Sequence, residues 1–170
     1  MAVLAAGGVL LVLLLVWLSV RRHRRRIRER RLRQELDRQI RTADQLSPRE
    51  FEELIARLLV QAGWADVKVS GGAGDLGADV TAPSGDGRIL VVQCKRYAPH
   101  RQVSSPEMQR FLGTVWNEHH ADLAWFVTTG RFTGPAADLA LRNDIELIPR
   151  PRLAAWMSTG QLAADPTQRV

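Results

Sequence analysis

Three residues with functional side chains lie where two predicted strands approach each other: Asp79, Gln93 and Lys95. Residues 78–82 and 88–96 each predict a strand, and the SGDG sequence between them is typical of a hairpin turn. Because side chains alternate along a strand, Gln93 and Lys95 share one face and lie about 7 Å apart. If the two strands pair, Asp79 approaches both.

A carboxylate, an amide oxygen and a lysine at one edge of a sheet suit metal-assisted phosphodiester hydrolysis. A hard divalent cation binds carboxylate and carbonyl oxygens, and it lowers the pKa of a bound water. A nearby lysine can position that water and stabilise the charge that builds on the phosphate. The alternative is that these residues are only the polar end of a strand. Cys94, on the opposite face, is expected to pack in the core.

Four segments in order resemble the Mrr-like catalytic domain of type IV restriction endonucleases, a Q-x-K variant of the PD-(D/E)xK nuclease superfamily. The segments are FEELIARLL, GGAGDLGADV, VVQCKRY and FVTTGRFTGPAADLA, and they cover about residues 47–150. The resemblance implies cleavage of DNA with Mg²⁺ or Mn²⁺. It also implies that Asp79 is the central metal ligand, Gln93 an oxygen ligand and Lys95 the catalytic lysine.

The resemblance further implies an acidic residue in the first helix of the domain, near the site. On a helical wheel Glu52 lies at the border of the buried face beside Leu59, whereas Glu53 points to solvent. We therefore expect Glu52 to join Asp79 and Gln93 as a catalytic and metal-binding residue. A plain surface charge on the helix is the alternative for Glu52.

Two glycines and two arginines are candidate DNA contacts: Gly72, Gly74, Arg96 and Arg131. The glycines would let a phosphate approach the backbone, although glycines alone indicate nothing more than a turn. The arginines would bind phosphates, or remain solvated surface charges. Asp75 is either a further acid near the metal or a turn residue.

The order of predicted elements indicates the fold. A capping box at Ser47 and Glu50 starts a helix that ends near Gly63. The predicted elements after it are strands 65–70, 78–82 and 88–96, helix 105–118, strand 121–129, helix 135–142, strand 145–149 and helix 151–158. An antiparallel meander followed by helical crossovers predicts an α/β, restriction-endonuclease-like mixed sheet flanked by helices. The nuclease domain would occupy residues 47–158, followed by a flexible tail, 159–170.

The amino-terminal 20 residues predict a single transmembrane helix. Residues 2–20 carry no charge, and a helix of this length spans about 28 Å, near the bilayer core thickness. Trp17 would lie at an interface. Because arginines follow the span, we expect a single-pass protein of the cell membrane whose carboxy-terminal domain is cytoplasmic. A secretory signal peptide is the alternative, but the uncharged start argues against it.

Residues 21–46 predict a basic helical juxtamembrane stalk. Residues 21–41 contain 11 arginines and a net charge of +8, whereas residues 42–170 have a net charge of −2. The expected partners are membrane lipid through residues 1–41 and DNA, and these are not exclusive. A thin apolar stripe leaves a homodimer contact open. The single cysteine excludes an intrachain disulfide and fits a reducing cytoplasm.

The sequence thus predicts a membrane-anchored DNA endonuclease that uses a divalent metal, and the type IV resemblance leaves modified or foreign DNA open as its substrate. Two alternatives stay open. One is a nuclease-fold module, weakly active or inactive, that tethers DNA at the membrane; the other is a membrane-surface scaffold without a nucleic-acid role. Gln93 carries no charge, so the metal site relies on few carboxylates, and this keeps the inactive module open.

Overall fold

The computed structural model describes residues 2–70 and 76–162, with side chains described from Trp17 onward. The chain divides into two compact units, residues 1–35 and residues 36–170. Helix α1 (Ala2–Asp44) supplies the first unit and extends into the second. Every side chain from 21 to 35 on this helix is exposed.

The predicted transmembrane helix is contradicted. Within the part of the chain that the structure describes, no helix is both long enough and apolar enough to cross a membrane. The uncharged stretch does not form an element of its own, because it continues without a break into the arginine-rich stretch as one 43-residue helix. The α/β fold is therefore found without the predicted membrane span before it.

The second unit contains helix α2 (Pro48–Gln61), which begins as the sequence predicted. The Ser47 hydroxyl accepts a hydrogen bond from the Glu50 N–H at 3.3 Å, and the Glu50 carboxylate accepts one from the Ser47 N–H at 2.7 Å. These two bonds satisfy backbone donors that the first turn of a helix leaves unpaired. Phe51, Ile55 and Leu59 form the buried face of α2.

A five-stranded sheet is the centre of this unit, with strand order β1-β2-β3-β5-β7. The strands are β1 (Lys68–Val69), β2 (Val80–Pro83), β3 (Ile89–Lys95), β5 (Leu123–Thr128) and β7 (Ile145–Ile148). The first three are antiparallel, and β3, β5 and β7 are parallel. The predicted mixed sheet is thereby confirmed.

Two short strands, β4 (Gln102–Val103) and β6 (Arg131–Phe132), form a separate parallel pair. The sequence did not predict them, because two residues are too few to show a strand periodicity. They matter for the site because β4 follows β3 directly in the chain and fixes the path of the segment between them.

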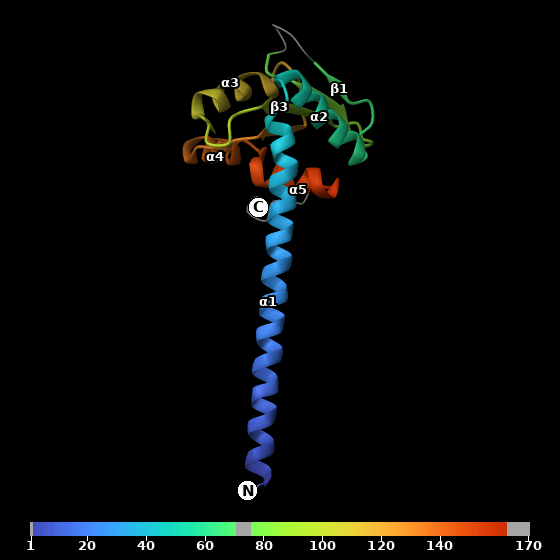
Figure 1. Ribbon diagram of the computed structural model, residues 1–170. Helices are drawn as coiled ribbons and strands as arrows, with labels where there is room; N and C mark the ends of the chain where they lie inside the picture. The colour runs from blue at the N-terminus through green and yellow to red at the C-terminus, as the bar shows by residue number, and fades with distance from the viewer. Residues whose placement is uncertain (1, 71–75, 163–170) are drawn as a thin grey trace. The chain divides into compact units, whose positions relative to one another are not determined.

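Helices cover both faces of the main sheet (Figure 1). Helix α2, helix α5 (Arg150–Thr159) and the end of α1 pack on the face that carries Val80, Val92 and Cys94. Helices α3 (Ser105–Val115) and α4 (Gly134–Leu141) pack on the face that carries Val91 and Phe126. Strand β3 is therefore covered on both sides.

The last turns of α1 belong to the core of the second unit. Ile40 is 2% exposed and Ala43 is fully buried, and both pack in the same cluster as Phe51 and Trp156. The sequence assigned these residues to a stalk outside the nuclease domain. Their burial shows that the compact unit begins before the capping box at Ser47.

Candidate active site

Asp79 and Gln93 face each other across the β2–β3 hairpin. The register pairs Val80 with Val92, so the next position along each strand brings Asp79 opposite Gln93. The Gln93 amide donates a hydrogen bond to the Asp79 carboxylate, and the Cys94 N–H donates a second at 2.6 Å. Asp79 and Gln93 are each 6% exposed. The hairpin register therefore produces the contact that the sequence predicted.

Lys95 is the last residue of β3 and is half-buried. Its carbonyl accepts a hydrogen bond from the Thr128 hydroxyl at 2.8 Å and from the Thr129 N–H at 3.3 Å. These bonds attach the end of β3 to the end of β5. Thr128 and Thr129 thus fix the backbone from which the Lys95 side chain extends.

A cleft of about 640 Å³ opens beside Gln93 and Lys95. The loop after β3 contributes Tyr97 and Arg101 to its wall, and α3 contributes Glu107, Arg110 and Thr114. This volume lies within the usual range for ligand sites. Among the described residues that line it are three cations, Lys95, Arg101 and Arg110, and one carboxylate, Glu107, and this excess of positive charge suits an anionic substrate.

Gly77 borders the cleft next to the Gln93 amide. Its φ of +87° lies in the left-handed region, and a Cβ placed there would lie 2.9 Å from Gln93 Oε1. The Thr114 hydroxyl donates to the Leu76 carbonyl at 2.6 Å and ties this loop to α3. A glycine is required here both for backbone conformation and for the space beside the amide oxygen.

Tyr97 joins Arg101 and Glu107 within the cleft wall. Its hydroxyl donates to the Glu107 carboxylate, and the Arg101 guanidinium lies over its ring at 3.9 Å from the ring centroid. Burial raises the pKa of Tyr97, and the hydrogen bond to Glu107 raises it further. Burial also raises the pKa of Glu107, but hydrogen bonds from Ser104 and Tyr97 outweigh it, so the pKa of Glu107 lies below its ordinary value.

Sequence reasoning missed Arg101, Arg110, Tyr97 and Glu107 as cleft residues. One signal was present, because Ser104 and Glu107 form a capping box at the start of α3. That box places Glu107 in the first turn, where the Ser104 hydroxyl donates to it at 2.6 Å. The arginines gave no comparable signal, because their position depends on the path of the chain between β3 and α3.

Glu52 lies on α2, which packs on the opposite face of the sheet from the cleft wall in α3. Its side chain is 16% exposed and lies 3.6 Å from Arg49. Burial raises the pKa of the Cys94 thiol well above its ordinary value; the charges of Asp79 and Glu52 raise it further, and Lys95 opposes them. Glu52 is therefore within electrostatic range of the site, while Cys94 is a buried thiol unsuited to nucleophilic attack.

The other predicted DNA contacts do not gather at the cleft. Arg96 is half-buried and Arg131 is exposed on β6, and neither is among the described residues that line the cleft. Gly72, Gly74 and Asp75 lie outside the described residues. Of the predicted site residues, Gln93 and Lys95 therefore line the cleft. Asp79 does not line it but is hydrogen-bonded to the Gln93 amide.

The residues of the site fit a divalent metal held by few protein ligands. Among the residues that the structure describes, no group of three or more His, Cys, Asp or Glu side chains is placed to hold a metal ion. The available donors are hard oxygens, the Asp79 carboxylate and the Gln93 amide oxygen beside Gly77. Mg²⁺ commonly binds through one or two carboxylates and completes its shell with water and substrate phosphate. The donor set matches that kind of site.

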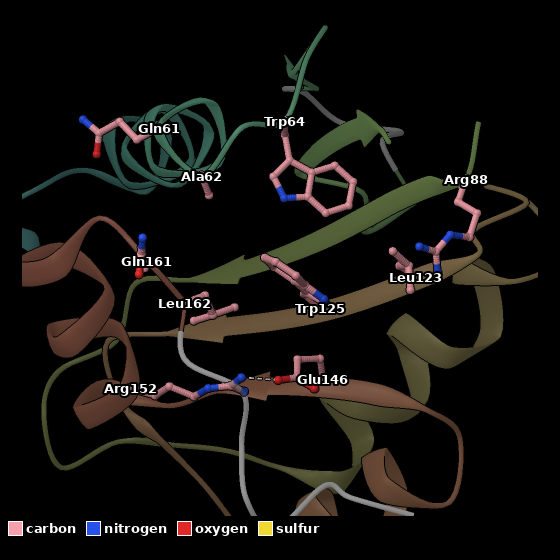
Figure 2. Close-up of a pocket in the computed structure, with 10 residues that line it drawn as sticks. All are labelled: Gln61, Ala62, Trp64, Arg88, Leu123, Trp125, Glu146, Arg152, Gln161 and Leu162. Carbon is pink, nitrogen blue, oxygen red and sulfur yellow. Dashed lines mark ion pairs between the residues drawn. The ribbon is translucent and has the colours of Figure 1, made fainter. Parts of the chain in front are cut away.

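A second cleft, of about 700 Å³, contains none of the predicted site residues (Figure 2). Trp64 and Trp125 form its walls, with ring centroids 6.0 Å apart and planes at 83°. Arg152 and Glu146 form an ion pair on another side of it. Because the predicted residues Gln93 and Lys95 line the first cleft, and none of the predicted site residues is among the described residues that line this one, the first cleft is the candidate active site.

Comparison with solved structures defines the class of the fold. The modification-dependent restriction endonuclease AspBHI aligns with a TM-score of 0.57 and 19% identity over 79% of this chain and 37% of that chain. The MspJI restriction endonuclease in complex with an oligonucleotide aligns with a TM-score of 0.53 and 22% identity over 71% and 29%. A protein of unknown function, AF1548, aligns with a TM-score of 0.52 and 21% identity over 61% and 58%. The second unit therefore has a restriction-endonuclease-like fold, and the chain spans less than two thirds of each of these proteins.

The chain belongs to the restriction endonuclease family of Mrr-type catalytic domains, a family of nucleases that act on DNA. The family's sequence profile matches residues 43–157, which is most of the second unit. No curated protein matches the sequence. The family match begins within the last turns of α1, in agreement with the burial of Ala43 in the core.

Proposed function

We propose that this chain is a DNA endonuclease that hydrolyses phosphodiester bonds with a divalent metal, Mg²⁺ or Mn²⁺. The observation that carries the proposal is the Asp79–Gln93 contact beside Lys95, at a cleft that also contains Arg101 and Arg110. A DNA strand carries a negative charge at every phosphodiester, so a cleft whose described lining has three cations and one carboxylate complements it.

Asp79 and Gln93 would hold the metal, which when bound supplies charge neutralisation and a water of lowered pKa. Lys95 extends from a backbone fixed by Thr128 and Thr129, and its ammonium would stabilise negative charge on the phosphate. The Cys94 N–H holds the Asp79 carboxylate in one orientation at 2.6 Å.

Arg101 and Arg110 would bind phosphates that flank the scissile bond. Arginine presents a planar fork of donors that matches phosphate oxygens. Arg101 is oriented by the Tyr97 ring beneath it, and Tyr97 is in turn held by Glu107. The cleft therefore separates two tasks, chemistry at Lys95 and Asp79 and substrate positioning at the arginines.

The test incubates the full chain with supercoiled plasmid in Mg²⁺, in Mn²⁺ and in EDTA, beside Asp79→Asn and Lys95→Ala. Lys68→Ala is the matched control, because Lys68 is exposed on β1. We expect nicking by the wild type and the control with metal, and loss of nicking in both site variants and in EDTA. Equal nicking by all four proteins would overturn the proposal.

A nuclease-fold module that binds DNA without cutting it is the second candidate. It is favoured by the neutral Gln93 and by the lack, among the described residues, of a three-ligand metal cluster. Retention of intact DNA by the wild type, unaffected by EDTA, would select this candidate. Methylated and unmethylated plasmids in the same assay test whether action depends on modified DNA, as the sequence resemblance led us to expect.

A further inference from the structure

The arginine-rich part of α1 is a strongly charged surface that the candidate active site does not use. Residues 21–33 contain nine arginines and one acidic residue, and every one of these side chains is exposed. Residues 42–170, which include the cleft, have a net charge of −2. Long-range attraction of a polyanion must therefore come from this helix rather than from the nuclease domain.

The arginines surround the helix instead of forming one face. At about 100° per residue, Arg24, Arg28 and Arg31 form one stripe along the helix. A second stripe on the opposite side consists of Arg26, Arg30 and Arg33. A surface that is cationic on both sides complements a partner that presents negative charge on both sides of the helix.

The same distribution argues against a lipid surface as the partner. A helix that lies in a membrane interface has an apolar face along its length. The two aliphatic residues within 21–33, Ile27 and Leu32, are both exposed and lie about 140° apart around the helix. They do not form a shared apolar face, so part of the arginines would point away from a lipid surface.

Duplex DNA presents the required geometry. A helix with its side chains is about 10–12 Å wide, and the major groove is about 12 Å wide with a row of phosphates along each wall. Like charges four residues apart, such as Arg24 and Arg28, repel along the helix in the absence of a partner. Phosphates on both walls would neutralise both stripes.

We propose that residues 21–33 of α1 form a sequence-independent surface for duplex DNA, separate from the cleft. The inference rests on the proposed function in one respect, because DNA is also the substrate of the cleft. Binding through the arginine stripes requires neither metal nor cleavage, so the two can be tested separately.

The experiment measures binding of the full chain to a fluorescent 20-base-pair duplex by anisotropy, in EDTA and as a function of salt. Two triple variants each neutralise one stripe: Arg24→Gln/Arg28→Gln/Arg31→Gln and Arg26→Gln/Arg30→Gln/Arg33→Gln. Glutamine keeps helix propensity close to that of arginine, and circular dichroism checks that the helix persists. The matched control neutralises three exposed cations of the second unit, Arg57→Gln/Lys68→Gln/Arg142→Gln.

Each stripe variant should lower the slope of log K against log salt by about 2.7, because each phosphate contact contributes about 0.9. The loss of affinity between about 50 and 200 mM salt should then be about 40-fold smaller than for the wild type. The control should leave the slope within about one contact of the wild type. An unchanged slope in both stripe variants would overturn the proposal, as would a slope that changes in one stripe alone.

Vesicles with and without anionic lipid form the second arm. Tight, arginine-dependent binding to anionic vesicles together with a flat salt dependence on DNA would overturn the proposal in favour of lipid. Failure of plasmid nicking with normal stripe-dependent DNA binding would reject the proposed nuclease activity and leave this inference standing. Normal nicking, together with DNA binding that neither stripe variant alters, would reject this inference and leave the proposed nuclease activity standing.

Discussion

The Arg150 guanidinium holds the Asp44 carboxylate through two contacts, Nη1 to Oδ1 at 2.6 Å and Nη2 to Oδ2 at 2.7 Å. The same Nη1 donates to the Thr129 carbonyl at 2.9 Å. Thr129 in turn donates its N–H to the Lys95 carbonyl. The end of α1 is therefore connected through one side chain to the strand end that carries the candidate catalytic lysine.

Removing either partner of this ion pair should destabilise the second unit. The two side chains are 16% and 20% exposed, so Asp44→Ala leaves a largely buried guanidinium without its carboxylate. We expect the free energy of unfolding to fall by about 1–3 kcal/mol, between the values for exposed and buried pairs. Urea unfolding of Asp44→Ala, Arg150→Ala and the double variant measures the coupling energy.

Asp37→Ala is the control for this cycle, because Asp37 is an exposed acid of the same helix. A coupling energy near zero would show that the contacts contribute nothing. Arg150→Ala should also slow cleavage more than Asp44→Ala does, because it additionally removes the hydrogen bond to Thr129.

Replacement of Gly77 should harm both stability and cleavage. Gly77→Ala introduces a Cβ at a φ of +87° and only 2.9 Å from Gln93 Oε1, so both backbone strain and a steric conflict follow. We expect a loss of about 1–3 kcal/mol in the free energy of unfolding. Cleavage should fall further than stability explains, because the Gln93 amide must move.

Gly87→Ala separates the two causes. Gly87 has a similar φ of +85°, but nothing lies within 4 Å of a Cβ placed there. Gly87→Ala should therefore lose stability through backbone strain but keep the cleavage activity of the wild type. Equal nicking activity in Gly77→Ala and Gly87→Ala would mean that the space beside Gln93 is unimportant.

Local pattern was sufficient to predict the contact between Asp79 and Gln93. The SGDG turn predicted that the two strands pair as a hairpin, and the register of that pairing brings Asp79 opposite Gln93. Arg150 and Asp44 are 106 positions apart in sequence, so no local pattern connects them. The position of Arg101 depends on the chain path through β4, which was too short to predict.

The amino-terminal helix shows what composition alone could not predict. Its helical character was predicted correctly, but the uncharged stretch was interpreted as a separate membrane span, which the described helices do not support. The buried Ile40 and Ala43 were hidden for a related reason. A thin apolar stripe on a charged helix does not reveal whether it packs on a core or on another helix.

Adding a carboxylate at position 93 should make folding depend on metal. In Gln93→Glu a second negative charge replaces the amide that donates to Asp79, and the two carboxylates repel. We expect the free energy of unfolding in EDTA to fall by about 1–3 kcal/mol and Mg²⁺ to restore it. Thermal unfolding with and without Mg²⁺ measures this directly.

The control for that experiment is Gln61→Glu, an exposed position on α2. If Mg²⁺ stabilises neither the wild type nor Gln93→Glu, the Asp79–Gln93 pair does not hold a metal. If Mg²⁺ restores Gln93→Glu specifically, the concentration of Mg²⁺ required for half-maximal nicking should also fall.

Glu107 should add a pH-dependent contribution to stability. Its pKa lies below the ordinary 4.5 because hydrogen bonds from Ser104 and Tyr97 outweigh the effect of burial. The contribution is therefore present in full above about pH 4.5 and is lost as the pH falls through the lowered pKa of the folded state. Glu107→Gln should unfold more easily than the wild type by about 0.3–1 kcal/mol near pH 7, with a difference that shrinks in acid. Urea unfolding from pH 7 to about pH 3 measures it, and Glu118→Gln, which removes an exposed charge beyond α3, is the control.

Arg101 should act on substrate binding rather than on the chemical step. Its guanidinium stacks on the Tyr97 ring at the cleft wall, and it lies on the loop after β3 rather than on the strand end that carries Lys95. Arg101→Ala should raise KM for DNA about five- to tenfold, because one charged contact is lost, and should leave kcat nearly unchanged. It should also lower the slope of log K against log salt by about 0.9. Arg101→Lys should recover the salt slope but not the full KM, because an ammonium neither stacks nor binds phosphate through two donors.

Arg142→Ala, which removes an exposed arginine at the end of α4, is the matched control. A fall in kcat with KM unchanged would instead place Arg101 at the reacting phosphate, because only an interaction formed in the transition state alters kcat alone.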